Sequence, residues 1–177
     1  MSAIPETLDG FSVISGGVVA SRGFKAGSIA AGIKASGALD LGGIFSTVAP
    51  CTVAATFTTN RVTAANVEIN RARVAGGQAR GVVFNSGNAN TYTGAEGRAD
   101  AMRMAELFAD RQGVASDEIL MASTGVIGFR LPMDRVADGI RRLELTSVDG
   151  IDVAAAMMTT DAYPKTIAVE VPLSIGT

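Results

Sequence analysis

The hydrophobic pattern of the chain changes its period near residue 100, and this change limits the folds that the chain can adopt. Before that point, short apolar runs bounded by glycine and polar residues are typical of strands. These runs lie at 28–34, 52–58, 66–70 and 80–85. Gly76 and Gly77 indicate a turn before the last of them.

After that point, apolar residues recur at helical spacing. Ala101, Met104, Ala105 and Phe108 predict a first helix, and Gly113 is its expected stop. Two more helices are predicted near 134–143 and 151–158, with short strands at 118–122 and 166–171. This order of elements predicts an α/β (α+β) layered sandwich, in which helices pack on a mixed sheet. We expect residues 1–177 to form a single domain.

The residue types that the chain lacks exclude several functions. It contains no histidine, which excludes a Ser-His-Asp or Cys-His site within the chain, and Cys51 alone cannot form a thiolate zinc cluster. The net charge is -2 without basic runs, so we expect no nucleic-acid binding. The single cysteine, the N-terminus without a basic n-region, and the lack of roughly 20 consecutive apolar residues predict a cytoplasmic protein without a membrane span.

The segment 85–94, with the sequence NSGNANTYTG, follows a predicted strand and is rich in small polar side chains. The side chains of Asn85, Asn88 and Asn90 offer both hydrogen-bond donors and acceptors, and Asn85 and Asn88 are candidates for lining a site. The alternative is a polar loop that only caps the next helix.

The segment 123–128, with the sequence STGVIG, offers two donors side by side. The hydroxyl of Thr124 and the unshielded backbone N–H of Gly125 are the kind of pair that forms an oxyanion hole. The alternative is an ordinary turn with a glycine in the left-handed conformation.

Two further places carry candidate binding groups. Thr159 and Thr160, in the sequence MMTTDAYPK of residues 157–165, either bond the last carbonyls of a helix or face a substrate. Lys34 either binds a carboxylate or is a solvated surface lysine.

Together these segments resemble the ornithine acetyltransferases, also called glutamate N-acetyltransferases. The resemblance is carried by residues 29–41, 55–67, 79–97, 122–134 and 154–165. It implies the self-cleaving, N-terminal-nucleophile-like architecture of DmpA and the ornithine acetyltransferases. It also implies a reaction of arginine biosynthesis, in which acetyl moves from N2-acetyl-L-ornithine to L-glutamate through a threonine acyl-enzyme. No cofactor and no metal are implied, although some members also use acetyl-CoA as a donor.

The same resemblance assigns residues and partners. Thr124 and Gly125 would form the oxyanion hole, and Thr159 would contact substrate, with Thr160 as the neighbouring candidate. The polar loop around Asn85, which includes Asn88, would line or support the site, and Lys34 is a further candidate for lining it. The nucleophile would be the first threonine of a β chain cut from the same precursor. The expected assembly is a heterotetramer of two α and two β chains.

The sequence departs from the family pattern in two places. Thr91-Tyr92 stands where many relatives have Ala-Cys, and the chain stops at Gly176-Thr177, before the expected Ala-Thr cleavage point. The amine of Thr177 lies in a peptide bond and cannot act as the free nucleophile. We therefore expect an α chain that is inactive alone and completed by a β chain. The alternatives are a related self-processing aminopeptidase or amidohydrolase, and a non-catalytic remnant.

Overall fold

The structure, a computed structural model, describes residues 7–8, 10–146 and 150–173 and contains two sheets. Gly176 and Thr177, which bear on the cleavage expectation, lie outside the described residues. The larger sheet has the strand order β3-β4-β5-β6 and the smaller one the order β1-β2-β7. The strands of the larger sheet are β3 (Phe24–Ile29), β4 (Leu41–Ser46), β5 (Gly81–Asn88) and β6 (Ile119–Val126). Those of the smaller sheet are β1 (Thr7–Leu8), β2 (Phe11–Ile14) and β7 (Ala168–Glu170).

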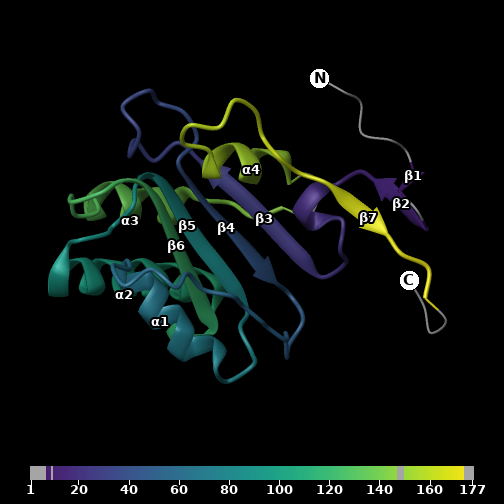
Figure 1. Cartoon of the computed structure of the whole chain (residues 1–177), viewed down its shortest axis with the longest axis horizontal. Helices are drawn as coiled ribbons and strands as arrows, with labels where there is room; N and C mark the ends of the chain where they lie inside the picture. Colours follow the sequence, from purple (N-terminus) through teal and green to yellow (C-terminus); the bar gives the residue numbers. More distant parts are fainter. Residues whose placement is uncertain (1–6, 9, 147–149, 174–177) are drawn as a thin grey trace.

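Three strands of the larger sheet end at the same edge. β3 and β5 each run antiparallel to β4, and β6 runs parallel to β5, so β3, β5 and β6 share one direction. The chain therefore leaves these strands at one common edge, which we call the carboxyl edge (Figure 1). The segments 30–40, 89–93 and 127–132, which contain or adjoin most of the predicted site residues, all begin there.

Helices cover both faces of this sheet. α1 (Ala65–Val74), α2 (Gly94–Gln112) and α3 (Met133–Arg142) pack on one face, and α4 (Ile151–Met157) packs on the other. Side chains alternate between the two faces along a strand. Val83 accordingly packs in the core under α1, α2 and α3, and its neighbour Phe84 packs in the core under α4. Two short 3-10 helices complete the fold, η1 (Gly17–Val19) and η2 (Ser116–Glu118). The predicted layered α/β sandwich with a mixed sheet is confirmed.

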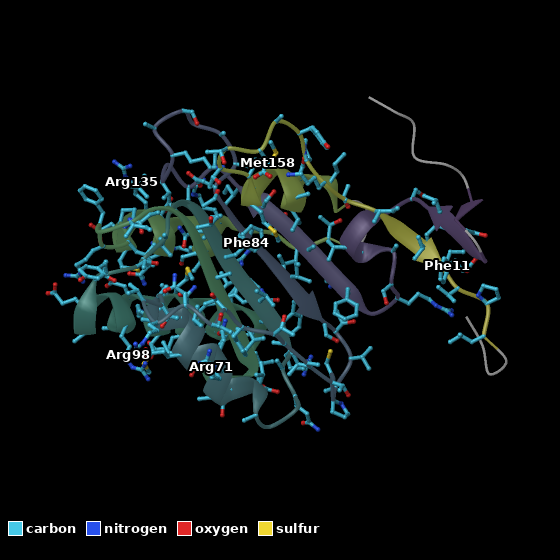
Figure 2. The ribbon with its side chains drawn as sticks, viewed as in Figure 1. Phe11, Arg71, Phe84, Arg98, Arg135 and Met158 are labelled. Carbon is cyan, nitrogen blue, oxygen red and sulfur yellow. The ribbon has the colours of Figure 1, made fainter. Side chains whose placement is uncertain are left out.

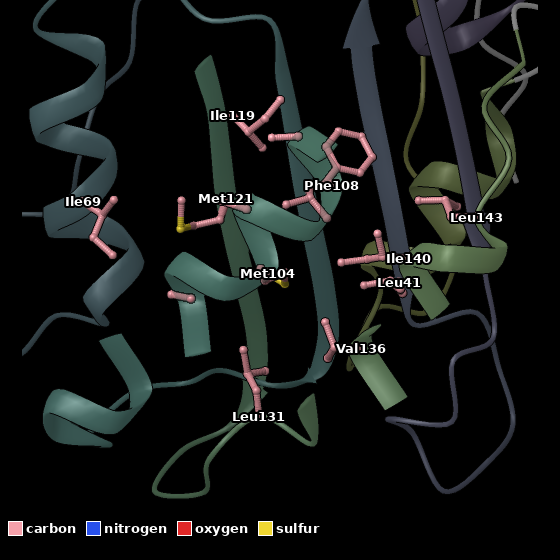
Figure 3. Packing of buried hydrophobic residues seen from close by; sticks show 14 of the residues in the cluster. Leu41, Ile69, Met104, Phe108, Ile119, Met121, Leu131, Val136, Ile140 and Leu143 are labelled. Carbon is pink, nitrogen blue, oxygen red and sulfur yellow. The ribbon is translucent and has the colours of Figure 1, made fainter. Parts of the chain in front are cut away.

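The larger core lies between the sheet and the three helices (Figure 3). Its centre is occupied by Met104 and Phe108 of α2, which are fully buried against β4, β5 and β6. A Cβ atom on Gly43 would lie only 2.5 Å from the ring of Phe108, so this position of β4 has room for a glycine alone. No helix in the described part of the chain is long and apolar enough to cross a membrane.

Several predicted elements were wrong or shifted. The run 66–70 is helical, because Asn66 and Ile69 are buried on one face of α1. The run 52–58 forms no strand beyond a single bridge at Thr52. Most of its residues are exposed, so its alternating apolar side chains do not face a core. β4 was missed because Gly42 and Gly43 are poor strand formers. The first strand ends at Ile29 instead of extending to 34.

The remaining elements were predicted correctly, with longer bounds in some cases. The first predicted helix extends over Gly94–Gln112 and ends at Gly113, whose φ of 69° is left-handed. α3, α4, β5, β6 and β7 correspond to the predicted runs. The expected turn at 76–77 is present.

The outer edge of β6 is closed along its first half by a side chain of α1. The amide of Asn70 donates to the carbonyl of Met121 at 2.7 Å, and the N–H of Met121 donates to the Asn70 Oδ1 at 3.1 Å. Asn70 thus pairs with Met121 as a neighbouring strand would.

Replacing Asn70 by alanine should leave both backbone groups of Met121 unpaired next to a helix. We expect the free energy of unfolding to fall by about 1–3 kcal/mol, measured by urea denaturation. Glu68→Ala on the same helix is the matched control, because Glu68 is exposed and its ion pair with Arg98 spans 3.7 Å. Equal stability of the two variants would contradict the strand-like pairing of Asn70.

Candidate functional site

The outer edge of β6 is open where the predicted oxyanion residues lie. The N–H and C=O of one strand residue point to the same side, and the side alternates along the strand. Because the backbone groups of Met121 point outward to Asn70, those of Ser123 and Gly125 point outward too. The N–H of Gly125 therefore faces away from β5, at the free end of the edge.

Thr124 lies beside this amide on the α4 face of the sheet. It is the register partner of Ser86, and the hydroxyl of Ser86 donates to the carbonyl of Ala156 in α4. Both Thr124 and Gly125 are exposed. Within the described residues, the hydroxyl of Thr124 has no hydrogen-bond partner. The sequence predicted a turn after a strand, but both residues lie inside β6, so the strand itself holds the two donors.

The position of Gly125 depends on its close approach to β5. Its φ is +132°, and a Cβ atom there would lie 2.4 Å from the carbonyl carbon of Gly87 and 2.6 Å from the nitrogen of Asn88. Only glycine fits at this distance. The peptide between Gly87 and Asn88 therefore fixes the direction of the Gly125 amide.

The segment that contains Thr159 and Thr160 joins the same face of the sheet. It begins where α4 ends at Met157, at Met158 in Figure 2. The carbonyl of Ala156, one residue before that end, bonds the hydroxyl of Ser86. Both threonines are exposed, and in the described part of the chain neither hydroxyl bonds a helical carbonyl. The segment is held by Asp161, which pairs with Lys165 and accepts a hydrogen bond from the N–H of Thr159. The hydrogen bond from Lys165 is the main reason that the pKa of Asp161 is lowered.

The asparagines brace the carboxyl edge from inside. Asn85 is 1% exposed, and its amide donates to the Asn88 carbonyl at 2.8 Å. The amide of Asn88 donates to the Arg130 carbonyl at 2.9 Å, and its oxygen accepts from the N–H of Asn90. The oxygen of Asn85 is buried without a partner in the described residues. Asn85 and Asn88 are thus buried, and both of their amides bond backbone carbonyls at the carboxyl edge.

Sequence reasoning missed Asp40, whereas it named Asn90 only as one of the polar side chains of the loop 85–94. Asn90 is fully buried and connects the loop to α2 by donating to the Gly97 carbonyl at 2.7 Å. Asp40 is fully buried, and its carboxylate accepts from the amides of Ala31 and Lys34 at 2.7 and 2.8 Å. An aspartate directly before an apolar run was the available signal for Asp40.

Lys34 lies at the same edge. Its ammonium donates to the carbonyl of Leu39 at 2.8 Å, and the side chain is half-buried. A Cβ atom on Gly87 would lie 3.0 Å from the Cγ of Lys34, so the lysine stem passes over the glycine that pairs with Gly125.

An apolar rim borders the site. It consists of exposed side chains at the end of β6 and on the two adjacent loops, namely Tyr92, Val126, Ile127 and Phe129. The loops are joined by hydrogen bonds from Ala89 to Val126 and from Gly128 to Thr91. Within the described residues, no group of three or more histidine, cysteine, aspartate or glutamate side chains is arranged to hold a metal ion.

Comparison with known proteins gives consistent matches. The model of the ArgJ family matches residues 25–177. The arginine biosynthesis bifunctional protein ArgJ of Symbiobacterium thermophilum is 46% identical over 167 residues, covering 92% of this chain and 41% of that protein. The protein of the same name from Geobacter sulfurreducens is 47% identical over 146 residues, covering 81% and 37%. The chain thus spans about two fifths of the length of these relatives.

Solved structures share the fold. A crystal structure of ornithine acetyltransferase from Mycobacterium tuberculosis, complexed with ornithine, matches with a TM-score of 0.87 and 40% identity, covering 90% of this chain and 88% of that chain. The structure of the arginine biosynthesis bifunctional protein argJ from Bacillus halodurans matches with a TM-score of 0.80 and 31% identity, covering 93% and 96%.

Proposed function

Because the chain belongs to the ArgJ family, we propose that it is part of an acetyltransferase of arginine biosynthesis. The acetyl group would move from N2-acetyl-L-ornithine to L-glutamate, giving ornithine and N-acetylglutamate. The α chain, with residues 1–177 as one domain, supplies the oxyanion hole, and a β chain supplies the nucleophile. The solved ornithine acetyltransferase in complex with ornithine supports this choice of substrate class.

One geometric observation carries the proposal. The outward N–H of Gly125 and the unpartnered hydroxyl of Thr124 lie on consecutive residues at the open end of β6, in the part of the chain that is described. Two fixed donors at one point stabilise the negative oxygen that develops when an acyl group is attacked. Thr159, or its neighbour Thr160, contacts the substrate from the segment after α4. Asn85 and Asn88 support the donors by bracing the strand ends.

The proposed chemistry combines these donors with a threonine nucleophile from the β chain. The hydroxyl of an N-terminal threonine attacks the acetyl carbon, and its proton passes to its own amine, whose pKa near 7.7–8.0 leaves a fraction neutral. The tetrahedral intermediate collapses as the bond to the ornithine nitrogen breaks and that nitrogen takes the proton. The amine of glutamate then attacks the acetyl carbon of the acetyl-threonine. The ester bond breaks, the threonine hydroxyl takes back a proton, and N-acetylglutamate is released. The reaction requires no cofactor or metal, and acetyl-CoA can replace acetylornithine as the donor.

The partner would cover the apolar rim. Tyr92, Val126, Ile127 and Phe129 are exposed next to the candidate donors, and charged residues make up only 18% of the chain. Both features favour a large interface. We propose that the β chain from the same precursor covers this rim, in a cytoplasmic heterotetramer of two α and two β chains, and that the α chain alone is inactive.

The full-length protein tests the proposal directly. Purified protein is mixed with N2-acetylornithine and glutamate, and ornithine and N-acetylglutamate are quantified. We expect equal amounts of both products and a transient acetylated β-chain threonine detectable by mass spectrometry. Release of free acetate instead of N-acetylglutamate would indicate a hydrolase. The absence of any acetylated intermediate or product would indicate a remnant without catalysis.

A further inference from the structure

The loop 30–40 crosses the carboxyl edge from one face of the sheet to the other. At its start, Ala31 and Ile33 pack against the core that contains α2 and α3. At its end, Leu39 packs against the core that contains α4. The loop therefore crosses the carboxyl edge and contacts Gly87 at the end of β5, the strand that pairs with the end of β6 holding Thr124 and Gly125.

The side chain of Lys34 makes this crossing. Its stem passes over Gly87, at 3.0 Å from the Cβ position of that residue, and its ammonium reaches the Leu39 carbonyl at 2.8 Å. The ammonium thus bonds the end of the loop whose Leu39 side chain packs on the α4 face, the face on which the side chain of Thr124 also lies. Gly87 is the register partner of Gly125, so the stem contacts the end of β5 that pairs with the part of β6 holding the candidate oxyanion donors.

The charge of Lys34 is held in place but is not neutralised by a direct ion pair. The carboxylate of Asp40 anchors the loop through the amides of Ala31 and Lys34, whereas the ammonium turns to Leu39. Among the described residues, no ion pair within 4 Å includes Lys34, and two of its three N–H groups have no partner. Partial burial lowers the pKa of Lys34, while the charge of Asp40 opposes this shift.

The neighbouring cation Arg135 contacts the loop from the other side. Its guanidinium donates to the Gly32 carbonyl from α3, on the opposite side of the loop from Leu39. Arg135 is therefore a suitable control for the general effect of positive charge near the edge.

We propose that Lys34 binds the α-carboxylate of the amino-acid substrate and so places the reacting nitrogen beside Thr124 and Gly125. This proposal rests on the proposed function, since both acetylornithine and glutamate carry a carboxylate one carbon from the reacting nitrogen. A partly desolvated ammonium with free donors forms a strong, charge-assisted hydrogen bond to a carboxylate.

Lys34→Met in the full-length protein tests the proposal, with Arg135→Met as the control. Because the donor also carries an α-carboxylate, the acetylated protein is first formed to completion with excess acetylornithine and isolated. Acetyl transfer from it is then measured to glutamate and to glutamate α-amide, which lacks the α-carboxylate charge. We expect Lys34→Met to raise the KM for glutamate roughly tenfold to a hundredfold, while transfer to the α-amide stays at the wild-type level. Arg135→Met should change neither value. An equal loss with both acceptors would overturn the proposal.

A second experiment separates charge from folding. Lys34→Cys, with Cys51 replaced by serine, is folded and then alkylated either with an aminoethyl or with a neutral propyl group. Only the aminoethyl adduct should recover the low KM for glutamate, because the two adducts differ chiefly in the ammonium. Equal KM values for the two adducts would overturn the proposal. If the wild-type protein transfers no acetyl group at all, the proposed function itself has failed and this proposal falls with it.

Discussion

Replacing Thr124 by alanine is expected to slow acetyl transfer in the full-length protein by on the order of a hundredfold. The variant removes one of the two donors proposed for the oxyanion, and one such donor typically contributes about 2.7–4 kcal/mol to the stability of the transition state. Thr124 is exposed, and its hydroxyl has no partner among the described residues, so the unfolding transition in urea should not change. Transfer rates with acetylornithine and glutamate measure the effect.

Two matched variants define what this result means. Thr124→Ser keeps the hydroxyl and should keep most of the rate. Thr91→Ala removes a hydroxyl from the adjacent loop, which bonds the Ala89 carbonyl at 3.2 Å, and should leave the rate nearly unchanged. A wild-type rate for Thr124→Ala would remove this residue from the oxyanion hole.

Gly125→Ala should damage both the fold and the reaction. The new Cβ would lie 2.4 Å from the backbone of Gly87, and a φ of +132° is unfavourable for any side chain. We expect a loss of about 2–4 kcal/mol in the free energy of unfolding, because backbone strain and a clash with backbone atoms add. The strand ends must separate to accept the methyl group, so acetyl transfer should fall at least as far as in Thr124→Ala.

Gly128→Ala is the control for backbone strain alone. Gly128 also has a positive φ, +93°, but no atom lies within 4 Å of its Cβ position. We expect this variant to lose only about 1 kcal/mol, as measured by urea denaturation. Equal stability of the Gly125 and Gly128 variants would contradict the close approach of β5 and β6.

The elements that could be predicted from the sequence are those with long, uninterrupted patterns. α2 was predicted because Met104 and Phe108 repeat at helical spacing and Gly113 terminates the helix. β4 was not, because its glycines are required by the rings of Phe84 and Phe108, which approach from distant parts of the chain. The five-residue pattern at 66–70 was too short to distinguish a strand from α1.

In the candidate site, too, the residue types could be predicted from the sequence, whereas their geometry could not. The residue types at Thr124 and Gly125 indicated paired donors, but their direction depends on the pairing of β6 with β5 and on Asn70. The approach of the segment after α4 depends on the bond between Ser86 and Ala156, which are 70 residues apart. Asn88 was expected to line or support the site, and the bond from its amide to the Arg130 carbonyl could not be predicted. Such contacts arise from tertiary packing and leave no local signal.

The most direct test of the oxyanion hole is a crystal structure of the full-length protein with its acetylated intermediate, trapped with acetylornithine in the absence of glutamate. We expect the acetyl oxygen to lie about 2.7–3.1 Å from both the hydroxyl of Thr124 and the backbone nitrogen of Gly125. An acetyl oxygen that contacts other donors, or points to solvent away from β6, would contradict the central claim.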